Sequence, residues 1–283
     1  MSEFVEVPGG RIAYEVIGAG PLVVLEHGMG DTRASYRFLA PLIAAAGYRV
    51  ASVDMRGHGE SSTGWSSYTR ADTAGDLIAV IEQLGGPAVI VGQSFSGGSA
   101  TIAAASRPEL VTAVVEIDPF TRPVPINFAA LLSNAPYRHG GLLLMRLAVT
   151  GSIPTWLKYL DFAYPGVKPA DWDEWLARLE RNLREHGSIK AAQKMGTSKP
   201  TDAGAALPGV RCPVLVIMGT RDSDFPDPRA EAETIVKLLP DGLGRFVMID
   251  GAGHYPHAQY PEQVAAAVLP FLNEQFSQER TGA

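Results

Sequence analysis

The sequence predicts an α/β protein built on a mostly parallel, doubly wound sheet with helices on both faces, and three observations support this prediction. Short apolar runs alternate with amphipathic helical segments along most of the 283 residues. Several of these runs are almost continuously apolar, as expected of parallel strands that are buried on both faces. One of them, within 88–100, turns directly into a helix of small residues. The chain is long enough for one large α/β domain that carries an insertion.

The expected elements follow one another in a regular order. A hairpin opens the chain, because strand-like stretches at 5–7 and 11–17 flank the turn sequence Pro8-Gly9-Gly10. Further strands are expected at 21–26, 48–54, the first part of 88–100, 111–118, 212–218 and 245–249. Helices are expected at 35–46, 69–84, the second part of 88–100, 228–239 and 261–276.

The regular alternation stops after Pro119 and resumes at about residue 208. Between these points the sequence contains proline-punctuated helical pieces rich in aromatic residues, such as 156–160 and 171–176, and no convincing strand. We therefore predict a core domain formed by residues 1–118 and 208–283. Residues 119–207 are predicted to form a helical cap that lies above the carboxyl edge of the sheet.

The composition describes an ordinary globular protein and argues against several classes of partner. Hydrophobic residues make up 46% of the chain, charged residues 19%, and the formal net charge is −6. This negative charge argues against binding to nucleic acids or to anionic membrane surfaces. We therefore expect a small-molecule substrate as the main partner, and the sequence does not indicate an oligomeric state.

Sequence features also bear on the compartment. The N-terminus lacks the basic and apolar regions of a signal peptide, and no stretch is apolar for the roughly 18–20 residues that a membrane span needs. The single cysteine, Cys212, cannot form an intrachain disulfide and gives no support for an oxidising compartment. We therefore expect a cytoplasmic protein.

The stretch 88–100 places Ser94 at the apex of a very tight turn between a strand and a helix. Such a turn brings the backbones of the strand and the helix close together, so small residues are needed two positions before and after the apex. Gly92 and Ser96 occupy these positions. The turn exposes the Ser94 hydroxyl at the carboxyl edge of the sheet, beside a backbone N–H that can face an oxyanion. This stretch resembles the G-x-S-x-G nucleophile elbow of the α/β-hydrolase family, with Ser96 in place of the second glycine.

A serine hydroxyl needs a neighbouring base, and the base needs a group that fixes its tautomer. In the chain order of the α/β-hydrolases, the acid follows a late strand and the histidine follows the last one. Asp222 comes just after the expected strand 212–218, and His254 comes just after 245–249. The resemblance thus implies a catalytic triad of Ser94, Asp222 and His254.

Two further motifs extend the resemblance, which covers residues 22–271. The sequence His27-Gly28-Met29-Gly30 matches the HG-x-G loop of the family. It implies that the backbone N–H groups of Met29 and Phe95 form the oxyanion hole, and that Gly28, Met29 and Phe95 contact the substrate. The segment 54–61 matches the D-x-R-G-x-G-x-S turn, whose role is structural. The family fold has an eight-stranded, mostly parallel sheet with an inserted helical cap.

Other residues of the right chemical types compete for these roles. His257 is an alternative base, which we expect at the start of the last helix. Asp118 and Asp224 are alternative acids. Asp250, His254 and His257 could be considered as metal ligands, but no further ligand cluster supports them, so we expect neither a metal nor a cofactor. We interpret His27 and His58 as residues that structure loops. Trp156, Trp172 and Trp175 either line the substrate cavity or pack the cap against the core, and we do not include them in the site.

The resemblance implies hydrolysis through an acyl-enzyme on Ser94. An apolar cap, with Met29 and Phe95 near the nucleophile, favours a small or medium, largely uncharged ester or lactone. A carbon–carbon bond hydrolase or a cofactor-free perhydrolase would need the same triad, and some family members with a complete triad serve as small-molecule receptors with little turnover. Haloalkane dehalogenases and epoxide hydrolases of the family have an aspartate at the elbow, so Ser94 argues against both.

Overall fold

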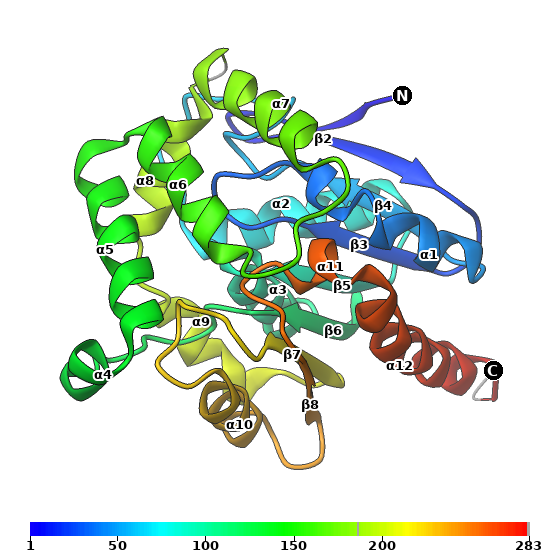
Figure 1. Cartoon of the computed structure of the whole chain (residues 1–283). Helices are drawn as coiled ribbons and strands as arrows, with labels where there is room; N and C mark the ends of the chain where they lie inside the picture. The colour runs from blue at the N-terminus through cyan, green and yellow to red at the C-terminus, as the bar shows by residue number, and fades with distance from the viewer. Residues whose placement is uncertain (186, 282–283) are drawn as a thin grey trace.

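The computed structural model describes residues 1–185 and 187–281, and it contains an eight-stranded sheet flanked by helices (Figure 1). The strands are β1 (Glu3–Val7), β2 (Gly10–Ile17), β3 (Leu22–Glu26), β4 (Arg49–Val53), β5 (Ala88–Gln93), β6 (Val111–Ile117), β7 (Val214–Gly219) and β8 (Gly244–Ile249). Their order across the sheet is β1-β2-β4-β3-β5-β6-β7-β8. The pairings β1–β2 and β2–β4 are antiparallel, and the others are parallel. The predicted fold class is confirmed.

Helices cover both faces of the sheet because neighbouring residues of each strand point in opposite directions. On one face α2 (Arg70–Gln83), α3 (Phe95–Ser106) and α10 (Pro228–Leu238) pack in the same apolar cluster as Val24 and Ile90. On the other face α1 (Leu39–Ala45) and α12 (Pro261–Thr281) pack with Val23 and Val89. All residues of β3 and β5 are buried, which explains their unbroken apolar sequences.

The prediction of one helix over 35–46 is wrong. The structure has a short 3₁₀-helix, η1 (Arg33–Tyr36), and then α1, which begins at Leu39. Pro41 explains the break, because a proline inside a helix lacks the N–H donor and its ring clashes with the carbonyl group four residues earlier. Starting at Leu39 places Pro41 in the first turn, where the N–H would have no intrahelical acceptor.

The segment between β6 and β7 is helical where it has regular structure. Its elements are α4 (Phe128–Ser133), α5 (Ala135–Thr150), α6 (Ile153–Ala163), α7 (Trp172–Glu185), α8 (Ser188–Thr197), α9 (Thr201–Ala206) and η2 (Leu207–Gly209). In Figure 1 α5, α6 and α8 group together at one end of the sheet, away from α12. Trp156, Tyr159 and Trp175 form an apolar cluster with Tyr255, which follows β8. This segment therefore packs against the loop that carries His254.

None of the helices in the described part of the chain has both the length and the apolar character that crossing a membrane requires.

Candidate active site

Ser94 lies at the junction of β5 and α3 in a backbone conformation that is rare for a side-chain-bearing residue. Its φ is 54° and its ψ is −113°. Such strained conformations persist where the surrounding structure holds them, and they are concentrated at functional sites. A Cβ atom at Gly92 would lie 2.4 Å from the carbonyl oxygen of Ser96, so the turn leaves no room for a side chain there. The local crowding thus explains Gly92 and presents the Ser94 side chain to the cavity.

The structure explains why serine is accommodated at position 96. The Ser96 hydroxyl accepts a hydrogen bond from the Gln93 N–H (2.9 Å) and lies 2.6 Å from the Glu26 carbonyl oxygen, to which it donates. It therefore bridges the ends of β5 and β3, at the point where the ladder between the two strands ends. A glycine at this position would leave these backbone groups without this partner.

Replacing Ser96 by alanine should destabilise the fold, because the buried Gln93 N–H loses its hydroxyl acceptor. A buried donor without a partner costs about 1–3 kcal/mol. The free energy of unfolding in urea should fall by that amount, whereas Ser133→Ala, which removes an exposed hydroxyl of α4, should leave it nearly unchanged. Equal stability of Ser96→Ala and the unmodified chain would contradict this role.

His254 and Asp222 form a buried hydrogen-bonded pair. The distance from His254 Nδ1 to Asp222 Oδ2 is 2.8 Å, and both side chains are inaccessible to solvent or nearly so. Nδ1 is therefore the donor, which leaves Nε2 free to accept a proton when the ring is neutral. The Asp224 N–H donates to Asp222 Oδ1 (2.9 Å) and fixes the carboxylate. The loop of His254 is held by its own N–H, which donates to the Ala163 carbonyl oxygen at 3.1 Å.

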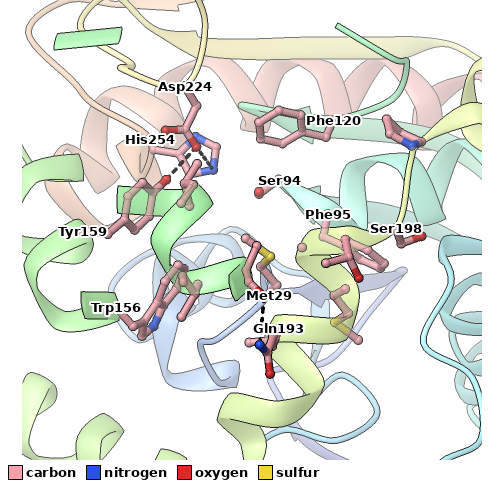
Figure 2. Close-up of a pocket in the computed structure, with 18 of the residues that line it drawn as sticks. Met29, Ser94, Phe95, Phe120, Trp156, Tyr159, Gln193, Ser198, Asp224 and His254 are labelled. Carbon is pink, nitrogen blue, oxygen red and sulfur yellow. Dashed lines mark hydrogen bonds and ion pairs between the residues drawn. The ribbon is translucent and has the colours of Figure 1, made fainter. Parts of the chain in front are cut away.

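Ser94 and His254 line the same cavity, whose volume is about 430 Å³. Figure 2 shows Ser94 between His254 and Asp224 on one side and Phe95 on the other. Within the described residues, the Ser94 hydroxyl forms no hydrogen bond in this structure. Catalytic hydrogen bonds are often long or poorly aligned in the absence of substrate, so this arrangement is compatible with proton transfer.

Two further carboxylates surround His254. Asp118, at φ 43°, accepts a hydrogen bond from the Gly219 N–H (2.9 Å), and its carboxylate lies within 4.8 Å of the ligand atoms of both His254 and Asp222. Burial, reinforced by the charge of Asp222, raises the pKa of Asp118 well above its usual range, which favours its neutral form. Asp224 Oδ2 lies 3.7 Å from His254 Nε2 and accepts a hydrogen bond from the Tyr159 hydroxyl at 2.6 Å. Asp222 is therefore the carboxylate that orients Nδ1.

The charges around His254 should control the pH dependence of the site. Burial disfavours the imidazolium, but Asp222 and then Asp224 outweigh this effect and raise the pKa of His254 above its ordinary value of 6.5. Only the neutral imidazole can act as a base, so kcat/KM for an ester should rise with pH through a pKa above 6.5. Asp224→Asn removes one negative charge and should move this rise to lower pH.

A pH–rate profile of both proteins tests this expectation. Asp250 belongs to the loop that carries His254 but is exposed, so Asp250→Asn serves as the control and should leave the profile in place. Superimposable profiles of Asp224→Asn and the unmodified chain would show that Asp224 does not act on the imidazole.

The structure separates His257 and Asp250 from this cluster. His257 lies in the short helix α11 (Pro256–Gln259) rather than at the start of α12, and its Nε2 lies 2.7 Å from the Ser35 hydroxyl. Burial lowers the pKa of His257 to about 3. Asp250 lies 3.2 Å from the Thr220 hydroxyl. Among the described residues, the group of potential metal ligands that does come together is Asp118, Asp222 and His254, in which Asp118 joins the His254–Asp222 pair.

The loop after β3 is fixed by two neutral histidines. Burial lowers the pKa of His27 to about 4 and that of His58 to about 3. His27 Nε2 accepts from the Met55 N–H (3.1 Å), so Nδ1 carries the proton and donates to the Gly28 carbonyl at 2.7 Å. His58 Nε2 accepts from the Gly30 N–H at 2.9 Å. Both residues therefore position the loop 27–30 through hydrogen bonds to its backbone.

The loop 27–30 needs glycines because neighbouring atoms lie too close to it for side chains. A Cβ atom at Gly28 would lie 2.3 Å from Gln93 Oε1 and 2.9 Å from the Ser94 Cβ atom. Gly30 has a φ of 73°, and its carbonyl oxygen accepts a hydrogen bond from Trp156 Nε1 at 2.9 Å. The backbone of Met29 is thus held between these two glycines and beside Ser94. The Phe95 N–H belongs to the first residue of α3 and has no intrahelical acceptor.

The cavity wall combines residues that the motifs identify with residues that they do not. Met29, Ser94, Phe95 and His254 line it as expected, and Gly28 contributes to its shape by its contact with Ser94. The segment between β6 and β7 adds mainly apolar side chains, including Leu144, Leu147, Trp156, Tyr159 and Met195. Tyr159 and Arg70 also line the cavity and belong to none of the motifs. Of the three tryptophans considered for the lining, Trp156 contributes to it, and Trp172 and Trp175 do not.

Known proteins show to which family this chain belongs. The model of the Alpha/beta hydrolase family matches residues 22–267. A 2-(acetamidomethylene)succinate hydrolase of Mesorhizobium japonicum is 30% identical over 274 residues, which are 93% of each chain. The bifunctional epoxide hydrolase 2 of Rattus norvegicus is 27% identical over 208 residues, 71% of this chain, and the match spans only 34% of that enzyme.

Solved structures share the fold at lower identity. An esterase from Thermogutta terrifontis has a TM-score of 0.75 and 23% identity, with 97% of this chain and 99% of that chain covered. The fold, the family match and the full-length relative agree, and the chain belongs to the alpha/beta hydrolase family.

Proposed function

We propose that this alpha/beta hydrolase is a serine hydrolase that cleaves a small or medium carboxylic ester or lactone through an acyl-enzyme. The observation that carries the proposal is the His254–Asp222 pair, hydrogen-bonded at 2.8 Å, in one cavity with a serine held at positive φ. An epoxide hydrolase is among the relatives, but the family members with that chemistry have an aspartate where this chain has Ser94.

In the proposed mechanism the Ser94 oxygen attacks the carbonyl carbon while His254 Nε2 takes the hydroxyl proton. Asp222 keeps the proton on Nδ1 and stabilises the imidazolium. The N–H groups of Met29 and Phe95 stabilise the tetrahedral oxyanion, an effect worth about 2.7–4 kcal/mol for one such donor. His254 then gives its proton to the leaving alcohol. Water, deprotonated by the same imidazole, attacks the acyl-enzyme, and His254 returns the proton to the Ser94 oxygen as the acid leaves.

We further propose that residues 119–207 act as a cap that shapes the acyl or alcohol site. Their contribution to the lining is largely apolar, which favours hydrocarbon parts of a substrate, and the volume of about 430 Å³ suits a small or medium molecule. A carbon–carbon bond hydrolase or a perhydrolase would use the same triad, so the substrate panel must include such compounds.

Covalent labelling and turnover together test the proposal. An alkyl 4-nitrophenyl phosphonate should form an adduct that mass spectrometry locates on Ser94. A panel of esters with acyl and alcohol chains of increasing length, together with lactones and diketones, should contain at least one ester or lactone class with a kcat of about 1–1000 per second. Tight binding with turnover far below this range on every compound would instead indicate a small-molecule receptor.

A further inference from the structure

Arg70 is a buried cation without an ionic partner, and it lines the cavity of Ser94. Only 4% of its surface is exposed. In the chain as described, no carboxylate oxygen lies within 4.0 Å of its guanidinium nitrogens. Asp202 exerts an electrostatic effect on it but does not reach that distance. A buried charge is costly unless it is paired, so this arrangement needs an explanation.

Four other buried or partly buried arginines in the described residues are paired with carboxylates, whereas the partly buried Arg49 donates to the Leu84 carbonyl and has no carboxylate within 4.0 Å. The pairs are Arg33 with Asp54, Arg37 with Asp171, Arg56 with Asp76 and Arg122 with Glu231. Arg56 is the other buried arginine among the described residues, and the chain provides a carboxylate for its guanidinium group. Arg70 differs from the paired arginines because it faces the cavity.

The guanidinium is held in place by neutral groups. Its Cζ atom lies 4.1 Å from the centroid of the Phe95 ring, Nε donates to the Phe120 carbonyl at 3.1 Å, and Nη1 donates to the Ser198 carbonyl at 3.3 Å. A Cβ atom at Gly98 would lie 2.6 Å from the Arg70 Cδ atom, so the absence of a side chain there makes room for the arginine stem. These contacts fix the cation but do not neutralise it.

The remaining hydrogen-bonding capacity points to an anion. A guanidinium has five N–H donors, and the two hydrogen bonds to carbonyl groups leave three of them available. Burial lowers the pKa of Arg70 to about 10, which keeps it charged at neutral pH. Lys199, which is exposed, lies at the same cavity wall and adds a second positive charge.

We infer that Arg70 binds a carboxylate of the substrate, so that the enzyme hydrolyses esters that carry a carboxylate on their acyl or alcohol chain. This inference deepens the proposed hydrolase function and rests on it. The Phe95 ring lies against the guanidinium, and Phe95 directly follows Ser94, so a carboxylate on Arg70 would be a short chain away from the reacting carbonyl. The inferred substrate is thus an anion and differs from the largely uncharged ester or lactone that the sequence alone suggested.

A carboxylate fits this site better than a phosphate monoester. The buried Arg70 guanidinium balances one negative charge, and the charge of the exposed Lys199 is screened by solvent, whereas a phosphate monoester carries about 1.5–2 negative charges at neutral pH. The planar fork of donors also matches a carboxylate in two parallel hydrogen bonds. The rest of the wall is mainly apolar, which suits the hydrocarbon chain between the two ends of such a substrate.

Matched substrates test the inference through kinetics. Monoethyl glutarate is compared with ethyl pentanoate, and 4-acetoxybutanoate with butyl acetate, with acid release followed in a pH-stat. In at least one pair, kcat/KM of the unmodified enzyme should be higher for the anionic ester than for the neutral one. Arg70→Gln should reduce kcat/KM for that anionic ester by about 10–100-fold and for its neutral partner by less than about threefold. Arg70→Lys should retain part of the preference, and Arg107→Gln, an exposed arginine in ion pairs elsewhere, should retain all of it.

Either of two results would overturn the inference. The first is a preference for the neutral ester in both pairs. The second is an equal loss for anionic and neutral esters in Arg70→Gln, because that pattern belongs to a residue that only holds the fold together. If Arg70→Gln does not fold, competitive inhibition of the unmodified enzyme decides, and glutarate must then inhibit more strongly than glutaramide.

A binding measurement separates this inference from the proposed hydrolysis. Glutarate should bind to Ser94→Ala in calorimetry, and the double variant Ser94→Ala, Arg70→Gln should bind it at least about tenfold more weakly. This result would support the carboxylate site even if no ester were hydrolysed. Equal binding by the two variants would contradict the site even if esters were hydrolysed.

Discussion

Ser94→Ala should lower kcat on the best ester of the panel by at least about 10⁴-fold, because loss of a triad nucleophile leaves only the contributions of binding and of the oxyanion hole. The side chain makes no hydrogen bond that stabilises the fold, so the melting temperature should change little. Alanine at position 94 must adopt the same positive φ, so the substitution relieves little of the backbone strain at the turn. Activity should be measured by release of 4-nitrophenol, with the phosphonate adduct as an independent record of the nucleophile.

Ser99→Ala is the matched control for this experiment. Ser99 is also a buried serine of α3, and its hydroxyl has no hydrogen-bond partner in the described structure. Its loss should therefore leave kcat within about threefold of the unmodified enzyme, as expected for a site outside the machinery. If Ser94→Ala retained more than a few per cent of the activity while Ser99→Ala was normal, the nucleophile would have to be another residue.

Gly253→Ala should combine a large loss of activity with a loss of stability. A Cβ atom at this position would lie 2.2 Å from the Ala163 carbonyl oxygen and 2.3 Å from the Pro165 Cδ atom. Because the Ala163 carbonyl also accepts the His254 N–H, a displacement there moves the imidazole away from its working position. A misplacement of about 1 Å can cost about 100-fold in rate. Overpacking of this kind costs about 1–3 kcal/mol of stability.

Both effects can be measured on one preparation, kcat/KM by ester hydrolysis and stability by urea unfolding. Gly141→Ala is the control, because a Cβ atom there meets no atom within 4 Å and α5 should gain from alanine in place of glycine. Unchanged activity of Gly253→Ala would mean that the contact between the loop and the segment 163–165 does not position His254.

Local rules account for what the sequence predicts well. The crowding at the turn dictates small residues around Ser94, so the elbow can be identified from five neighbouring positions. Asp222 and His254 could be placed near it because the carboxyl ends of parallel strands share one edge of the sheet. Neither inference depends on how distant helices pack, and the structure places all three residues around one end of β5, β7 and β8.

Most features that the sequence did not predict depend on tertiary contacts, whereas the start of α1 depends on one residue, Pro41. Pro41 carried enough information to exclude one helix over 35–46, since its missing N–H marks a first turn. The residues next to Arg70 in the sequence do not indicate that its side chain packs against Gly98 and lines the cavity. Likewise the position of Asp224 near Nε2 follows from the path of the loop after β7. Charge at the site was therefore harder to predict than the nucleophile.

The hydrogen bond from Trp156 to Gly30 and that from His254 to Ala163 limit how this enzyme can be re-engineered. They join the helical segment to both parts of the proposed catalytic centre, the loop 27–30 and His254. We expect a chimera that takes the segment between β6 and β7 from a homologue to be inactive unless it keeps Trp156 and the backbone path of 163–165. The segment between β6 and β7 is thus tied to the proposed catalytic centre and is not an interchangeable module.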